Sequence, residues 1–159
     1  MYLWRIEKLK AEMAVRPFTD REVLPYLVAW LVLLEVVIVL TTFLPSSVNV
    51  WDGLEAASGL LLTVVGTLYV FWQNGGSRGE YFLQRYFAVG WVVGVRLIVG
   101  LLPAMLVFYV ALEALGSGSE DSTQWYDFVL ITAAEAGFYW RFGHHVRDLA
   151  SRSARLPGE

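Results

Sequence analysis

Three ionisable residues lie within stretches of sequence that are otherwise apolar. Glu35 is near the middle of the first stretch, Arg96 near the middle of the third and Glu135 near the middle of the fourth. A charge at the centre of a bilayer costs at least ~2.5–3.5 kcal/mol, so such residues pair with one another or line a water-filled cavity. We therefore predict a buried Glu35–Arg96–Glu135 cluster, in which two carboxylates share the five donors of one guanidinium. Such a cluster would either fix helix pairing or form a proton or ion pathway.

A second group of candidate residues mixes bases and histidines near the ends of the apolar stretches. Arg141, His144, His145 and Arg147 follow one another closely, and Arg85 opens the third stretch. The pattern is typical of a rim that binds phospholipid headgroups or docks a partner protein. It also fits a pH-sensitive patch through the two histidines, or ordinary anchoring at the membrane surface.

The composition offers little support for enzymatic chemistry. The chain has no cysteine and only two histidines, which excludes disulfides, thiol catalysis and a three-histidine metal site from one chain. Phosphate-binding loops, dinucleotide fingerprints, nucleophile elbows and zinc-protease motifs are absent. The net charge of −3 provides no basic field for nucleic acid. We expect no metal, no cofactor, no nucleic-acid partner and no enzymatic activity.

The elements that would position these residues are four apolar blocks. The 159 residues are 57% hydrophobic and 17% charged, against roughly 25% charged in a soluble domain. Each block has about the ~20 residues that a helix needs to cross a bilayer. We predict an all-α integral membrane bundle of four transmembrane helices, with spans at about 24–44, 54–73, 83–112 and 125–143. These form one domain, residues 18–150, between an N-terminal segment at 1–17 and a polar cytoplasmic tail at 151–159.

The N-terminal segment, residues 1–17, is predicted to be an amphipathic helix in the membrane interface. Its apolar residues recur on one helix face, and its charged residues lie on the other side. The alternative is a solvated helix that packs on its own bundle. Pro17 ends the helix, and capping boxes are predicted at Thr19–Glu22 and Ser77–Glu80.

Basic residues are distributed unevenly between the two sides of the predicted bundle. Of the twelve Lys and Arg residues, all but Arg96 flank the N-terminus, the connection between the second and third spans, or the C-terminus. The positive-inside rule therefore predicts a multi-pass protein of the inner (plasma) membrane with both termini in the cytoplasm.

Small residues recur at spacings of three and four in three of the spans, a pattern that lets helices approach closely. They are Ala56, Gly59, Thr63, Gly66, Gly90, Gly94, Ala133 and Gly137. One compact bundle has few surfaces that need them, so we expect a homo-oligomer. Pro103, inside the third span, predicts a kink.

The function that these patterns favour is that of a non-enzymatic membrane subunit. It would oligomerise in the lipid bilayer and anchor, sense or regulate a soluble cytoplasmic partner through its basic rim. The alternative is a small homo-oligomeric channel or transporter for ions or protons that uses Glu35, Arg96 and Glu135.

Overall fold

The computed structural model describes residues 2–43, 48–115 and 123–154. Within these residues every regular element is helical, which confirms the predicted all-α class. The elements are α1 (Ile6–Val15), α2 (Asp20–Phe43), α3 (Val50–Gln73), the 3-10 helix η1 (Gly76–Arg78), α4 (Phe82–Ala114) and α5 (Trp125–Ser153). Helix α5 thus continues well past the predicted span and into the predicted tail, of which residues 155–159 lie outside the described part.

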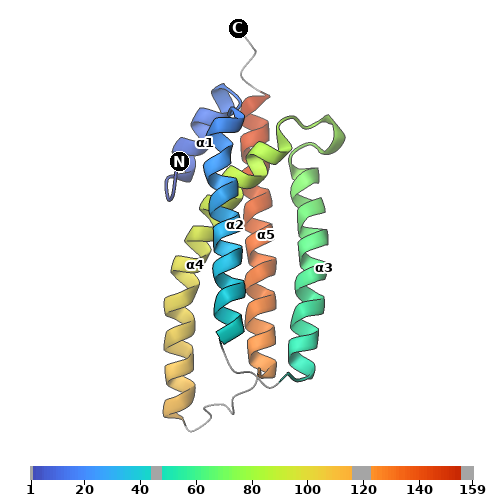
Figure 1. Cartoon of the computed structure of the whole chain (residues 1–159). Coiled ribbons are helices and arrows are strands. Elements are labelled where there is room, and N and C mark those ends of the chain that lie inside the picture. Colours follow the sequence, from blue (N-terminus) through green and yellow to red (C-terminus); the bar gives the residue numbers. More distant parts are fainter. Residues whose placement is uncertain (1, 44–47, 116–122, 155–159) are drawn as a thin grey trace.

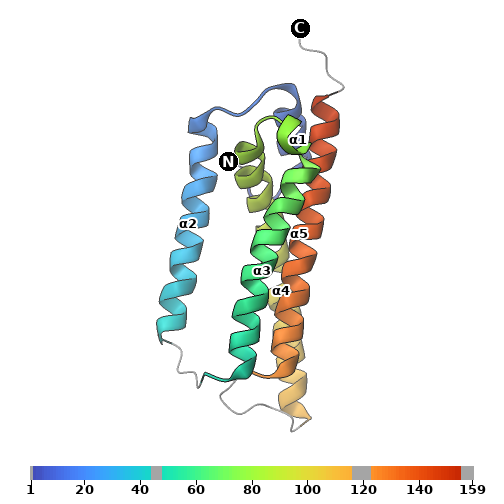
Figure 2. The same cartoon turned by 90° about the vertical axis from the view of Figure 1, so that its right-hand side faces the viewer.

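The four long helices run up and down, each antiparallel to the next in the chain (Figures 1 and 2). Helix α1, η1 and the last turns of α5 lie at one end, which we call the α1 end; the opposite end is the distal end. Helix α5 is central and packs on α3, α4 and α1, whereas α2 packs mainly on α4. Below its first turns α4 swings away from α5 (Figure 1). Both termini and the α3–α4 connection therefore share one end.

Helix α1 packs on α4 and α5 through its apolar face. Ile6, Leu9 and Met13 are buried there, together with Lys10. The apolar face of the predicted interfacial helix is thus covered by α4 and α5, which is the packing that the alternative describes. Lys10 is accommodated on this covered face because Glu7 of α1 and Asp148 of α5 pair with its ammonium group.

Local hydrogen bonds fix where the helices begin. The Thr19 backbone N–H donates to the Glu22 carboxylate at 2.8 Å, which is one half of the predicted capping box. Helix α3 begins earlier than predicted because Asn49 caps it, accepting from the Trp51 N–H while the Asp52 carboxylate accepts from the Asn49 N–H.

The turn between α3 and α4 depends on glycines. Gly75 and Gly76 have φ of 104° and 59°, a region that glycine adopts without strain. At Gly79 a Cβ would lie 2.2 Å from the Asn74 carbonyl oxygen, so only glycine fits. The predicted capping box at Ser77–Glu80 is wrong: η1 occupies this stretch, and α4 begins at Phe82 without a side-chain cap.

The hydrophobic core lies toward the α1 end, where α1 covers the first turns of α4 and the last turns of α5. Elsewhere, large apolar side chains of the long helices point outward, for example Leu60 on α3 and Leu106 on α4, which are 69% and 66% exposed. Among the helices as far as they are described, two, α3 and α4, are long and apolar enough to cross a membrane. Because their apolar windows are almost wholly unburied in the chain, lipid is the solvent that suits them.

Candidate functional site

Arg96 donates hydrogen bonds to the N-terminal segment, and no acid among the described residues pairs with it. Its Nε donates to the backbone carbonyl of Trp4 at 3.1 Å, and one Nη donates to the same oxygen. The guanidinium carbon lies 5.5 Å from the centroid of the Trp4 ring, a distance suited to a cation–π interaction. Because Trp4 leads into α1, Arg96 lies beside the α1 end of the molecule and not among the other two ionisable residues.

The two carboxylates lie apart from Arg96 and from each other. Glu135 of α5 packs against Gly59 of α3, where a Cβ would lie at ordinary contact distance, 3.5 Å from its Oε1. Glu35 is exposed on α2. No ion pair among the described residues includes Glu35, Arg96 or Glu135. The predicted cluster is therefore corrected, since three separate environments accommodate the three groups.

A network of four charges joins α1 to α5 at the α1 end. Lys10 Nζ lies 2.6 Å from Glu7 Oε1 and 2.7 Å from Asp148 Oδ2, and its side chain is 3% exposed. Arg152 contacts the same two acids, at 3.1 Å from Glu7 and 2.9 Å from Asp148. Hydrogen bonds from Lys10 lower the pKa of both carboxyl groups, and burial partly opposes this. The network was not predicted, although Lys10 shares a helix face with Ile6 and Met13.

The predicted rim residues separate into buried and accessible groups. Arg85 is buried, donating to Asn74 Oδ1 and to Ser153 Oγ, both at 2.9 Å. It thus joins the α3–α4 turn to the end of α5, which corrects its assignment to an accessible rim. The other rim residues lie on α5: Arg141, His144 and Arg147 are exposed, and His145 is half-buried. The Nδ1 of His145 has no hydrogen-bond partner among the described residues.

Polar contacts also join α3 to α5 toward the distal end. The hydroxyls of Ser58 and Thr132 lie 3.2 Å apart. The Thr123 hydroxyl donates to Asp52 at 2.5 Å, and the Asn49 amide donates to the Thr123 carbonyl at 2.7 Å. These pairs link residues more than seventy positions apart in the chain, so local patterning could not predict them.

The small residues fall into two sets. A Cβ at Gly66 would lie 2.2 Å from the Tyr139 ring and one at Gly90 would lie 3.0 Å from the Phe142 ring. The predicted set divides into Gly59, Gly66, Gly90 and Gly94, which face neighbouring helices, and Ala56, Thr63, Ala133 and Gly137, which are exposed. Pro103 lies exposed within α4, which continues past it.

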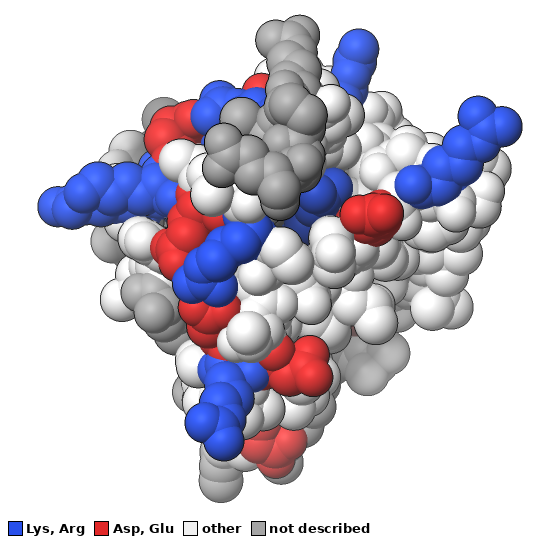
Figure 3. Space-filling view, turned by 90° about the horizontal axis from the view of Figure 1, so that it is seen from above, with Lys and Arg blue, Asp and Glu red and all other residues white. Residues whose placement is uncertain are grey.

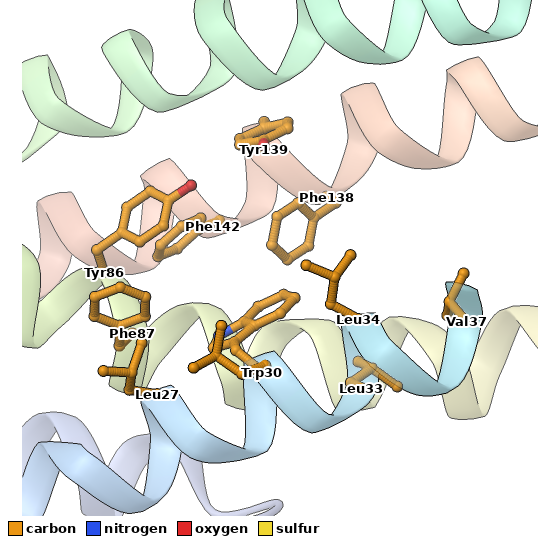
Figure 4. A pocket seen from close by; sticks show the side chains of 11 residues that line it. Leu27, Trp30, Leu33, Leu34, Val37, Tyr86, Phe87, Phe138, Tyr139 and Phe142 are labelled. Carbon is orange, nitrogen blue, oxygen red and sulfur yellow. The ribbon is translucent and has the colours of Figure 1, made fainter. Parts of the chain in front are cut away.

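An apolar cavity of about 380 Å³ lies where α2 faces α4 and α5 (Figure 4). Trp30 and Leu34 of α2 approach Phe87 of α4 and Phe138 of α5 across it. The Trp30 and Trp91 rings meet edge to face with centroids 6.0 Å apart. No charged residue lines this cavity, and its walls are mostly apolar.

A second groove, of about 510 Å³, lies between α4 and α5 and is lined by Arg96 and Arg141 above an apolar floor. Among the described residues there is no group of three or more His, Asp or Glu that could hold a metal ion.

Searches of protein-family models, of characterised proteins and of solved structures found no match to this chain. The functional argument therefore depends on the geometry of the chain itself.

Proposed function

We propose that this chain is a non-enzymatic, four-span subunit of the inner membrane with both termini in the cytoplasm. It acts by assembling with copies of itself and by holding a soluble cytoplasmic partner at the α1 end. The apolar exteriors of α3 and α4 support membrane insertion. The clustering of basic flanks at the α1 end supports the orientation.

The observation that carries the assembly proposal is the exposure of Glu35. Glu35 lies about 22 Å along the axis of α2 from its first residue, Asp20. The exposed residues around it include Leu31, Val32 and Val36. A carboxyl group at that depth is costly in lipid and is normally covered by another polar group. Within the described residues nothing covers Glu35, and we infer that a helix from another copy of the chain covers it inside a bilayer.

The α1 end provides the surface for a cytoplasmic partner. Seen from that end, acidic and basic side chains are interspersed over the left part of the view, and a few separate charges lie among uncharged residues on the right (Figure 3). A surface that carries charges of both signs favours specific recognition of a protein over general attraction to polyanions.

The channel alternative receives less support from the geometry. It required Glu35, Arg96 and Glu135 to converge, and the structure disperses them. The cavity between α2 and the other helices is mostly apolar and has no charged residue in its lining.

The chain has no cysteine, so single cysteines can report contacts between copies in native membranes. Val32→Cys lies one turn from Glu35 on an exposed surface, and we expect it to cross-link into a dimer. Leu106→Cys on α4 is similarly exposed and serves as the matched control. Adding Glu35→Leu to the Val32→Cys chain should abolish the cross-link, because the polar group that favours contact is removed.

Three results together would contradict the proposal: equal cross-linking of the two cysteine variants, a cross-link unaffected by Glu35→Leu, and a monomeric mass in mild detergent. A soluble protein that co-purifies with wild type, and is lost when α1 is deleted, would support the partner-holding role.

A further inference from the structure

The groove between α4 and α5 is hollow because small residues line it. A Cβ built at Gly100 or at Gly137 meets no atom within 4 Å, and Ala104 continues the floor along α4. The groove has a volume of about 510 Å³. In a membrane, an apolar groove on the outer surface of the helices lies against lipid acyl chains.

The groove also carries two positive charges and no negative one. Arg96 and Arg141 line it, and no acidic residue does. Neither arginine belongs to an ion pair among the described residues. The bonds to Trp4 occupy the Nε and one Nη of Arg96, so its guanidinium retains N–H groups for another acceptor. Two guanidiniums with free donors suit a phosphate oxygen.

The depth of the arginines fits a headgroup. Arg141 follows Trp140, which is 70% exposed, and exposed tryptophans gather at the headgroup level of membrane proteins. Arg96 binds Trp4, beside the helix that lies at the α1 end. From Arg96 the floor extends to Ala104, about 12 Å along the helix, in the direction of the distal end. The two arginines of the groove thus match the headgroup of a lipid molecule, and the apolar floor matches one of its acyl chains.

We propose that this groove binds one anionic glycerophospholipid from the leaflet at the α1 end. Its phosphodiester lies between Arg96 and Arg141, and one acyl chain lies on the floor formed by Gly100, Ala104 and Gly137. A net anionic headgroup is favoured because a zwitterionic one would bring its own cation toward two unpaired guanidiniums. The inference depends on the proposed membrane insertion and adds a ligand to it.

The test is native mass spectrometry of the full chain in mild detergent, titrated with phosphatidylglycerol or with phosphatidylcholine. We expect wild type to retain one phosphatidylglycerol at least tenfold more tightly than phosphatidylcholine. Arg141→Gln should lose most of that preference. Because Arg141 is exposed and has no ion-pair partner among the described residues, this variant should fold normally.

Two further variants separate a built site from general attraction. Arg78→Gln removes an exposed charge at the same end outside the groove and should leave the preference unchanged. Gly137→Leu fills the floor without changing any charge and should weaken binding of the lipid about tenfold.

Equal binding of the two lipids, or equal losses for Arg141→Gln and Arg78→Gln, would overturn the inference. So would a dimer that Gly137→Leu dissociates without any change in bound lipid, since a second copy would then occupy the groove. Extraction of membranes with alkaline carbonate distinguishes failure of the proposed membrane insertion from failure of the lipid site alone. A chain released by carbonate contradicts membrane insertion itself, whereas a retained chain without lipid preference contradicts only this site.

Discussion

The charge network between α1 and α5 leads to an asymmetric prediction for its two central members. Lys10 is almost completely buried, whereas Asp148 is about one-third exposed. Replacing Asp148 by Ala leaves the Lys10 ammonium with Glu7 alone, and the Glu7 side chain is 63% exposed. Breaking a fully buried pair in this way costs about 3–5 kcal/mol, and exposed pairs are worth roughly 0.2–1 kcal/mol. We expect about 2 kcal/mol for this intermediate case.

Replacing Lys10 by Met should cost much less. Arg152 still neutralises both acids, at 2.9 Å from Asp148 and 3.1 Å from Glu7. The variant also avoids the cost of burying an ammonium, and a thioether of similar length fills the same space on the α1 face. We therefore expect a change within about 1 kcal/mol, in either direction. The double variant Lys10→Met with Asp148→Leu should be close to Lys10→Met alone.

Hydrogen exchange of the α1 amides in detergent micelles measures this docking locally. A loss of about 2 kcal/mol lowers protection by roughly 30-fold, because 1.4 kcal/mol is a factor of ten. The amides of α3 serve as an internal control, since α3 lies apart from the network. If Lys10→Met and Asp148→Ala lower the protection of the α1 amides equally, the cost does not depend on which charge is left without its partner. That result would refute the argument. Unchanged protection in Asp148→Ala would show that apolar contacts alone dock α1.

Two further predictions concern helix packing and pH. Gly66→Ala should lower the free energy of unfolding by about 1–3 kcal/mol in a detergent titration, because its Cβ would lie 2.2 Å from the Tyr139 ring. In the control Gly53→Ala, on the same helix, the added Cβ meets no atom within 4 Å. This control should be neutral or slightly stabilising in the same titration. Burial, with smaller effects from nearby cations, lowers the pKa of His145 to about 4 from 6.5, so the unfolded chain binds a proton between these values that the folded chain does not. The stability of the folded chain should therefore fall as the pH falls from 6.5 to 4. Over this range the thermal midpoint should fall less in His145→Gln than in wild type or in His144→Gln. If the midpoints of all three proteins fall by the same amount, His145 is not the cause.

The helical elements could be predicted because their signals are local. Apolar blocks of sufficient length, the Pro17 break and the glycines after Asn74 all act within a few residues. The beginning of α3 was placed too late because Asp52 is a plausible cap, but here it serves as the acceptor that completes the box with Asn49. The end of α5 was placed too early because its polar last turns are held by α1 and not by lipid.

The partners of the charged residues could not be predicted to the same extent. Arg96 binds a backbone carbonyl that lies 92 positions away, and a carbonyl has no signature in the sequence. Lys10 was different, since its spacing of four and three from Ile6 and Met13 already placed it on the buried face. A charge on an apolar face is a signal for a partner on the element that covers that face.

The three charges that lie within apolar stretches of the sequence are accommodated in different ways. Arg96 donates to a backbone carbonyl of the segment before α1, and Glu135 packs against Gly59 of α3. Only Glu35 has no cover from the described chain. An uncovered charge in a bilayer costs about 2.5–3.5 kcal/mol, which corresponds to a factor of roughly 100 in an association equilibrium. One residue can therefore shift the chain from monomer to assembly, and Glu35→Leu should remove that preference while leaving the fold intact.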